Sequence, residues 1–121
     1  MPYQLSFDPR PGYLFARIKA DDIDRDNALR YLREVAEKAA ELRARRILLE
    51  RDIPTMLADS DLFFTTKDFL EMIGPTQVAF VNPHAQIGEA MEFAMTIGTN
   101  RGGRYKLFNT IADAENWLLR D

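Results

Sequence analysis

The segment TQVAFV, residues 76–81, decides the fold class. Four of its six residues are apolar and none is charged. Such a run is typical of a strand that is buried on both faces, as in the middle of a parallel sheet. A helix is expected over 82–100, with Asn82 as its N-cap and Pro83 at its first position. Because RYKLF, 104–108, is predicted to be a strand, the whole stretch predicts a parallel β-α-β unit.

The same alternation of strands and helices continues on both sides of this unit. Outside it, strands are predicted at 3–7, 13–20 and 46–50, and helices at 21–46, 60–73 and 110–119. The order β-β-α-β-α-β-α-β-α predicts one α/β domain over residues 1–121. We expect a mixed, mostly parallel sheet of about five strands with about four helices.

Charged and capping residues support the predicted helix ends. The helix at 21–46 carries opposite charges at its two ends, with Asp21, Asp22 and Asp24 first and Arg43, Arg45 and Arg46 last. These charges are expected to complement the helix dipole, and a phosphate site at the arginines is the alternative. Thr110 and Asp113 have the spacing of a capping box at the last helix.

Composition argues against several classes of protein. The chain has 121 residues, no cysteine and a net charge of −3. The absence of cysteine suits a reducing cytosol, and the missing basic excess argues against a nucleic-acid binder. Residues 1–15 lack the layout of a signal peptide, and no apolar run approaches the roughly 20 residues that span a bilayer. We therefore expect a soluble, cytoplasmic protein that is not integral to a membrane.

Few residues suggest catalysis. His84 is the only histidine and is expected in the first turn of a helix, where the dipole favours the neutral imidazole. Glu50 and Asp52 flank the carboxyl end of a predicted strand, where ligand sites of α/β sheets collect. Arg51, between them, is expected to neutralise their charge. An enzyme built on His84 with one of these carboxylates, or a Mg²⁺ site, is the alternative to the non-enzymatic protein without cofactor or metal that we expect.

The segment TNRGGR, 99–104, is a candidate anion-binding turn, formed by Asn100, Arg101, Gly102 and Arg104. It lacks the P-loop pattern and follows a helix instead of a strand. The simpler interpretation is a tight turn in which a glycine supplies a positive φ.

The predicted helix at 60–73 carries more apolar residues than one buried face can hold. Phe64 points away from Phe63 and Phe69 on a regular helix, so some apolar surface is expected to stay exposed. The candidate partner-binding surface consists of Ile53, Met56, Leu57, Asp59, Asp61 and Phe64.

The order of elements, and above all residues 93–119, resembles the SpoIIAA-like or STAS/SEC14-type domains of bacteria. The likeness is carried by an Asn-Arg-Gly turn, a strand ending in Phe, and a helix with Ala and Trp-Leu: Asn100, Arg101, Gly102, Phe108, Ala114, Trp117 and Leu118. It implies a single domain of that fold with a regulatory role like that of the anti-sigma-factor antagonists. Such a domain binds a protein partner or a second copy of itself as a homodimer. The SEC14-type members imply the alternative of a small apolar ligand or lipid held between helices and sheet.

Ser60 has two expected roles. In the antagonists, a serine at the start of the helix after the central strand is phosphorylated, and phosphate blocks docking. Aligning residues 48–50 with that strand end brings Ser60 close to this phospho-acceptor, although Asp61 and Leu62 replace the usual small residues. Ser60 is also the expected N-cap of the helix, so Ser60→Ala is expected to cost about 1 kcal/mol of stability.

Overall fold

In residues 2–120, which the computed structural model describes, the strands form one five-stranded sheet in the order β1-β2-β3-β4-β5. The strands are β1 Gln4–Arg10, β2 Tyr13–Lys19, β3 Arg46–Asp52, β4 Gln77–Val81 and β5 Arg104–Phe108. The helices are α1 Arg25–Leu42, α2 Asp59–Ile73, α3 Gly88–Asn100 and α4 Ile111–Leu119, with a short 3-10 helix at Ala85–Ile87. β1 pairs antiparallel with β2, and the other neighbours are parallel. The predicted element order and the mixed, mostly parallel sheet are confirmed.

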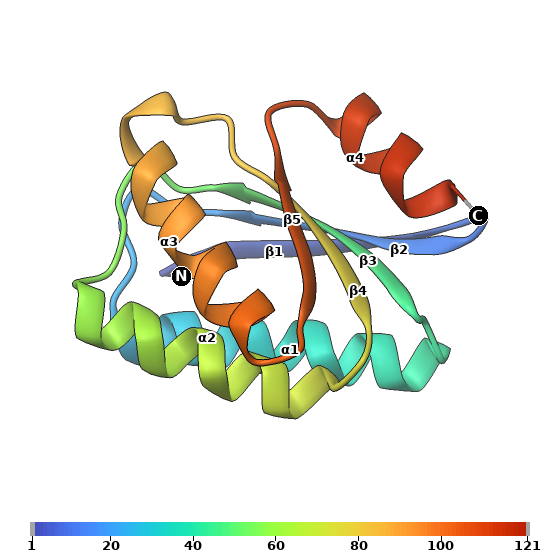
Figure 1. Cartoon of the computed structure of the whole chain (residues 1–121), viewed down its shortest axis with the longest axis horizontal. Helices are drawn as coiled ribbons and strands as arrows, with labels where there is room; N and C mark the ends of the chain where they lie inside the picture. Colours follow the sequence, from blue (N-terminus) through green and yellow to red (C-terminus); the bar gives the residue numbers. More distant parts are fainter. Residues whose placement is uncertain (1, 121) are drawn as a thin grey trace.

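The helices cover the two faces of the sheet unequally (Figure 1). Each of α1, α2 and α3 connects two neighbouring parallel strands, and the strand order advances in one direction. Right-handed crossovers that advance in one direction keep their helices on the same face. α4 follows the last strand and packs on the other face, against β3 and β4. The larger core therefore lies between the sheet and α1, α2 and α3.

Side-chain alternation divides the core into two clusters. On β4, Val78 and Phe80 belong to the larger cluster, whereas Ala79 and Val81 belong to the cluster under α4. All four side chains are buried. The predicted burial of this strand on both faces is confirmed, and it follows from the two-residue period of a strand.

Strands β1 and β2 form a hairpin, and β1 extends to Arg10, beyond the predicted end of this strand at residue 7. Arg10 pairs with Tyr13, so only Pro11 and Gly12 form the turn. Gly12 has a φ of +88°, which glycine adopts without steric cost, and a proline before such a glycine is typical of a type II turn. The strand can include Pro9 because β1 lies at the edge of the sheet.

α1 is shorter than predicted at both ends. Asp24 is its N-cap, and its side chain accepts a hydrogen bond from the N–H of Asn27 at 2.9 Å. At the other end, Arg43 has a left-handed backbone with φ 55°, and its N–H donates to the carbonyl of Ala39. The helix therefore ends at Leu42 and has no basic residue in its last turn, so the expected placement of the arginines inside it is wrong.

α3 begins later than predicted because Asn82 forms a turn instead of a cap. Its Oδ1 accepts from the N–H of His84 at 3.0 Å, and its Nδ2 donates to the carbonyl of the same residue at 2.8 Å. His84 consequently has an extended backbone ahead of the 3-10 helix and does not lie in the first turn of an α-helix. The cap predicted for α4 is confirmed, since Thr110 accepts from the N–H of Asp113 at 3.2 Å.

Candidate functional site

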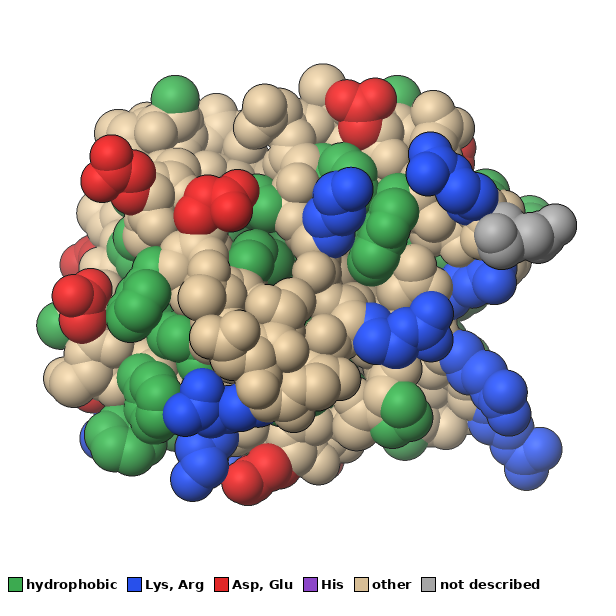
Figure 2. Space-filling model, viewed as in Figure 1, with side chains coloured by type: hydrophobic (Ala, Val, Ile, Leu, Met, Phe, Trp, Pro, Cys, Tyr) green, Lys and Arg blue, Asp and Glu red, His purple; other side chains and the backbone are tan. Residues whose placement is uncertain are grey.

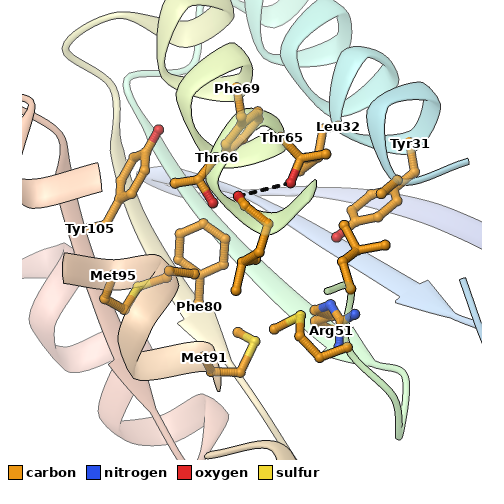
Figure 3. Close-up of a pocket in the computed structure, with 15 residues that line it drawn as sticks. Tyr31, Leu32, Arg51, Thr65, Thr66, Phe69, Phe80, Met91, Met95 and Tyr105 are labelled. Carbon is orange, nitrogen blue, oxygen red and sulfur yellow. Dashed lines mark hydrogen bonds between the residues drawn. The ribbon is translucent and has the colours of Figure 1, made fainter. Parts of the chain in front are cut away.

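A mostly apolar cavity lies inside the larger core, between the sheet and helices α1, α2 and α3 (Figure 3). Its volume is about 50 Å³, and 15 residues line it. The strands contribute Arg51, Phe80 and Tyr105, and α3 contributes Met91 and Met95 among others. A buried water needs roughly 10–15 Å³ measured in this way, so the cavity has room for a few waters or a small ligand.

Arg51 is the charged residue among those that line the cavity. Its side chain is buried, with 5% exposed. The guanidinium donates to the carbonyl of Ile53 at 3.1 Å and to that of Thr55 at 2.9 Å, and both acceptors are neutral. No carboxylate of residues 2–120 lies within 4.0 Å of it. The positive charge of Arg51 is thus buried without a counter-charge from the described chain.

Arg51 does not pair with the carboxylates beside it in sequence. Strand alternation places its side chain on the opposite face from Glu50 and Asp52. Arg17, which is the register partner of Glu50 on the neighbouring strand β2, forms the ion pair with Glu50 instead. The expectation that Arg51 neutralises these two carboxylates is therefore wrong.

Tyr105 is the second unusual residue of the cavity. It is 5% exposed, and its hydroxyl has no hydrogen-bond partner within residues 2–120. Burial raises the pKa of this hydroxyl above its ordinary value. The ring packs on Gly98 of α3, where any Cβ would collide with it. Figure 3 shows Tyr105 and Arg51 on opposite sides of the cavity.

A histidine–carboxylate pair lies at the carboxyl end of the parallel strands. Nε2 of His84 is 2.7 Å from Oδ1 of Asp52, and the two side chains are 24% and 35% exposed. Of the two carboxylates considered from the sequence, Asp52 is thus the one that His84 meets. Such a pair can fix an imidazole tautomer and exchange a proton with a bound molecule. Within residues 2–120, no group of three or more His, Asp or Glu side chains could hold a metal ion.

Ser60 is exposed in the first turn of α2 but is not its cap. The helix begins at Asp59, Ala58 occupies the N-cap position, and no side chain caps this end. The expected capping role is therefore wrong, because the helix starts two residues too early for Ser60 to occupy the N-cap position. The hydroxyl remains accessible at the surface.

Three residues of the candidate partner-binding surface lie where a partner could reach them. Phe64 is 47% exposed, Asp59 is exposed, and Asp61 is partly exposed. Oδ1 of Asp61 also lies 3.8 Å from Nη1 of Arg25 in α1. The start of α2 is thus a mixed acidic and apolar surface.

The other three residues of that surface turn inward. Met56 and Leu57 are half-buried and line the cavity. Ile53 has 0% of its side chain exposed and belongs to the larger core, so its assignment to a docking surface is wrong. The segment after β3 packs under the helices because it carries these apolar side chains.

The candidate anion-binding turn is a helix end. Asn100 is the last residue of α3, and Arg104 is the first of β5. The backbone N–H groups of residues 101–103 donate to carbonyls at the end of α3, so none is left to hold an anion. Gly102 has a φ of +90°, which agrees with the simpler interpretation as a tight turn. Nη1 of Arg101 also donates a hydrogen bond to the carbonyl of Ile97 at 3.4 Å.

Arg51 and Tyr105 were missed as functional candidates, for different reasons. The period of two on β3 puts Arg51 on the same face as the apolar Ile47 and Leu49, so this signal was present in the sequence. The hydroxyl of Tyr105 lacks a partner because of how distant segments pack around it, and no local sequence pattern predicts this.

Comparisons with known proteins assign no family to the chain. No family model matches it, and no curated protein matches its sequence. None of the helices in residues 2–120 is long and apolar enough to cross a membrane. The structure defines the class as an α/β protein with a five-stranded mixed sheet and four α-helices in the described residues.

Proposed function

We propose that the protein is a small regulatory domain that acts by binding a protein partner, as the SpoIIAA-like (STAS-type) domains do that its sequence resembles. The observation that carries the proposal is the exposure of two phenylalanines on neighbouring helices. Phe64 of α2 is 47% exposed and Phe93 of α3 is 42% exposed. Exposed aromatic side chains of this kind are typical anchors of protein interfaces.

A shallow groove that contains Phe93 lies between the first turn of α2 and α3. It is lined by Asp59, Gln86, Ile87, Glu89, Ala90 and Phe93. Figure 2 shows hydrophobic and acidic side chains next to one another over this end of the molecule. Carboxylates that line a groove together with apolar side chains favour a partner segment with apolar and basic side chains, because opposite charges steer and orient docking.

Ser60 is the candidate switch of this surface. It is exposed on the same helical turn as Asp59. A phosphate there would be favoured by the N-terminus of α2 and opposed by Asp59 and Asp61. It would add about two negative charges to the edge of the groove and so change the affinity for a basic partner.

Site-directed photocrosslinking in the source organism tests the docking surface. A photoreactive phenylalanine analogue replaces Phe64, Phe93 or, as the control, Leu42, which is 44% exposed at the end of α1. We expect the same protein adduct from positions 64 and 93 and none from position 42. An adduct of twice the mass of the chain would identify a second copy as the partner. Equal adducts from all three positions, or none from 64 and 93, would contradict the proposal.

A second candidate function is the binding of a small apolar ligand. The cavity lined by Arg51 favours it, since this lining is mostly apolar and includes a buried charge without a counter-charge from the described chain.

A further inference from the structure

The cavity contains a positive charge that the described chain does not balance. A guanidinium carries a positive charge in proteins, and that of Arg51 is buried, with 5% of the residue exposed. Its two bonds to carbonyls use two of its five N–H groups and supply no negative charge. A buried charge without a counter-charge is destabilising, and a bound anion would remove that cost.

Tyr105 is a second residue of the cavity lining with an unusual polar group. More than nine-tenths of its side chain is buried, and its hydroxyl has no partner in the described residues. Buried polar groups are nearly always hydrogen-bonded in folded proteins. Tyr105 and Arg51 come from different strands, β5 and β3, yet both line one cavity.

We propose that the cavity is a binding site for a short monocarboxylate, whose carboxylate pairs with Arg51 and whose apolar body lies among Phe69, Phe80, Met91 and Met95. The proposal rests on the ligand-binding candidate and is independent of the docking surface. A short monocarboxylate is smaller than a lipid and, unlike an alcohol, carries a negative charge.

The chemistry of the lining selects this class of ligand. One arginine balances one negative charge, and its planar fork fits a carboxylate with two parallel hydrogen bonds. A phosphate monoester would bring close to two charges into an apolar space that offers one cation. The volume of about 50 Å³ admits a body of a few carbon atoms but no long acyl chain.

Isothermal titration calorimetry of the full chain tests the proposal with three probes. Sodium propionate is the expected ligand, 1-propanol is its uncharged control, and palmitate is the long-chain probe. We expect propionate to bind with a dissociation constant of about 1 mM or tighter and about tenfold better than propanol. Palmitate is expected to show no saturable binding.

Two substitutions on β3 locate the site. Arg51→Met keeps the length of the side chain and removes its charge, a change that buried charged sites often tolerate. It is expected to weaken propionate binding about tenfold or more. Arg46→Met removes a charge from the same strand outside the cavity and is expected to leave binding unchanged.

If propanol binds as tightly as propionate, or Arg51→Met binds propionate like the wild type, the site is not built for a carboxylate. Saturable palmitate binding without propionate binding would overturn the short-ligand class, and no binding by any probe would contradict the proposal. If Arg51→Met fails to fold, the preference of the wild type for propionate over propanol decides alone. None of these results bears on crosslinking at Phe64 and Phe93.

Discussion

Nε2 of His84 lies 2.7 Å from Oδ1 of Asp52 across the carboxyl ends of β3 and β4. The double hydrogen bond of Asn82 with the backbone of His84 holds the histidine in this position. The pair ties the loop after β4 to the end of β3. It therefore has a structural role that can be measured whether or not it also moves a proton.

The His84–Asp52 pair is expected to show an energetic coupling. In a double-mutant cycle of His84→Ala and Asp52→Ala, urea unfolding should give a coupling free energy of about 0.5–1 kcal/mol, since both side chains are partly exposed. The control cycle of His84→Ala with Glu50→Ala should give no coupling, because Glu50 pairs with Arg17. Equal coupling in the two cycles would contradict the pairing.

Two serine and threonine positions should differ in stability. Thr110→Ala removes an observed cap and is expected to lower the free energy of unfolding by about 1 kcal/mol. Ser60→Ala removes no capping bond and should change it by less than about 0.5 kcal/mol. Chemical denaturation of both variants checks this, and a Ser60→Ala cost as large as that of Thr110→Ala would restore the capping role.

Tyr105→Phe is expected to stabilise the ligand-free protein. The substitution removes a buried hydroxyl that has no partner, which should raise the free energy of unfolding by about 1 kcal/mol. The matched control is Tyr13→Phe, because the hydroxyl of Tyr13 donates to Oε2 of Glu115 at 2.6 Å. This control should lose about 1 kcal/mol. A loss of stability in Tyr105→Phe would show that the hydroxyl is satisfied.

Alkaline pH should destabilise the protein through Tyr3. Burial, together with a hydrogen bond to Glu34, raises the pKa of Tyr3 to about 12 in the folded protein. Between the ordinary tyrosine value of about 10 and this value, the folded state holds a proton that the unfolded state has lost. The free energy of unfolding therefore falls as pH rises from about 10 to about 12. Tyr3→Phe should flatten this slope in denaturation curves measured across the range, and an unchanged slope would rule out Tyr3 as its source.

Most of the fold was accessible from local pattern. The sequence of β2 alternates with a period of two, and the sequence of β4 is a continuous apolar run. Both patterns are typical of strands with buried side chains, so the two segments could be predicted to be strands of the sheet. The β-α-β order then fixed parallel pairing. The ends of the helices were harder to predict. Arg43 ends α1 and Asn82 delays the start of α3 through hydrogen bonds with the backbone, which composition does not reveal.

The candidate sites were harder to predict than the fold. The contact of His84 with Asp52 joins the loop after β4 to the end of β3, and the burial of Ile53 depends on how the segment after β3 packs. Arg51 could have been placed on the inner face by strand alternation alone. The absence of a counter-charge near Arg51 could not be predicted from the sequence, because this absence depends on the positions of all nearby carboxylates.

The docking proposal is tested most directly by the affinity of the purified crosslinked partner for the wild type, Phe93→Glu and Leu42→Glu. Both variants place a carboxylate at an exposed apolar position, but only Phe93 lies in the groove beside α2. We expect Phe93→Glu to weaken binding about tenfold or more and Leu42→Glu to leave it unchanged. Equal affinities for all three proteins would contradict the account.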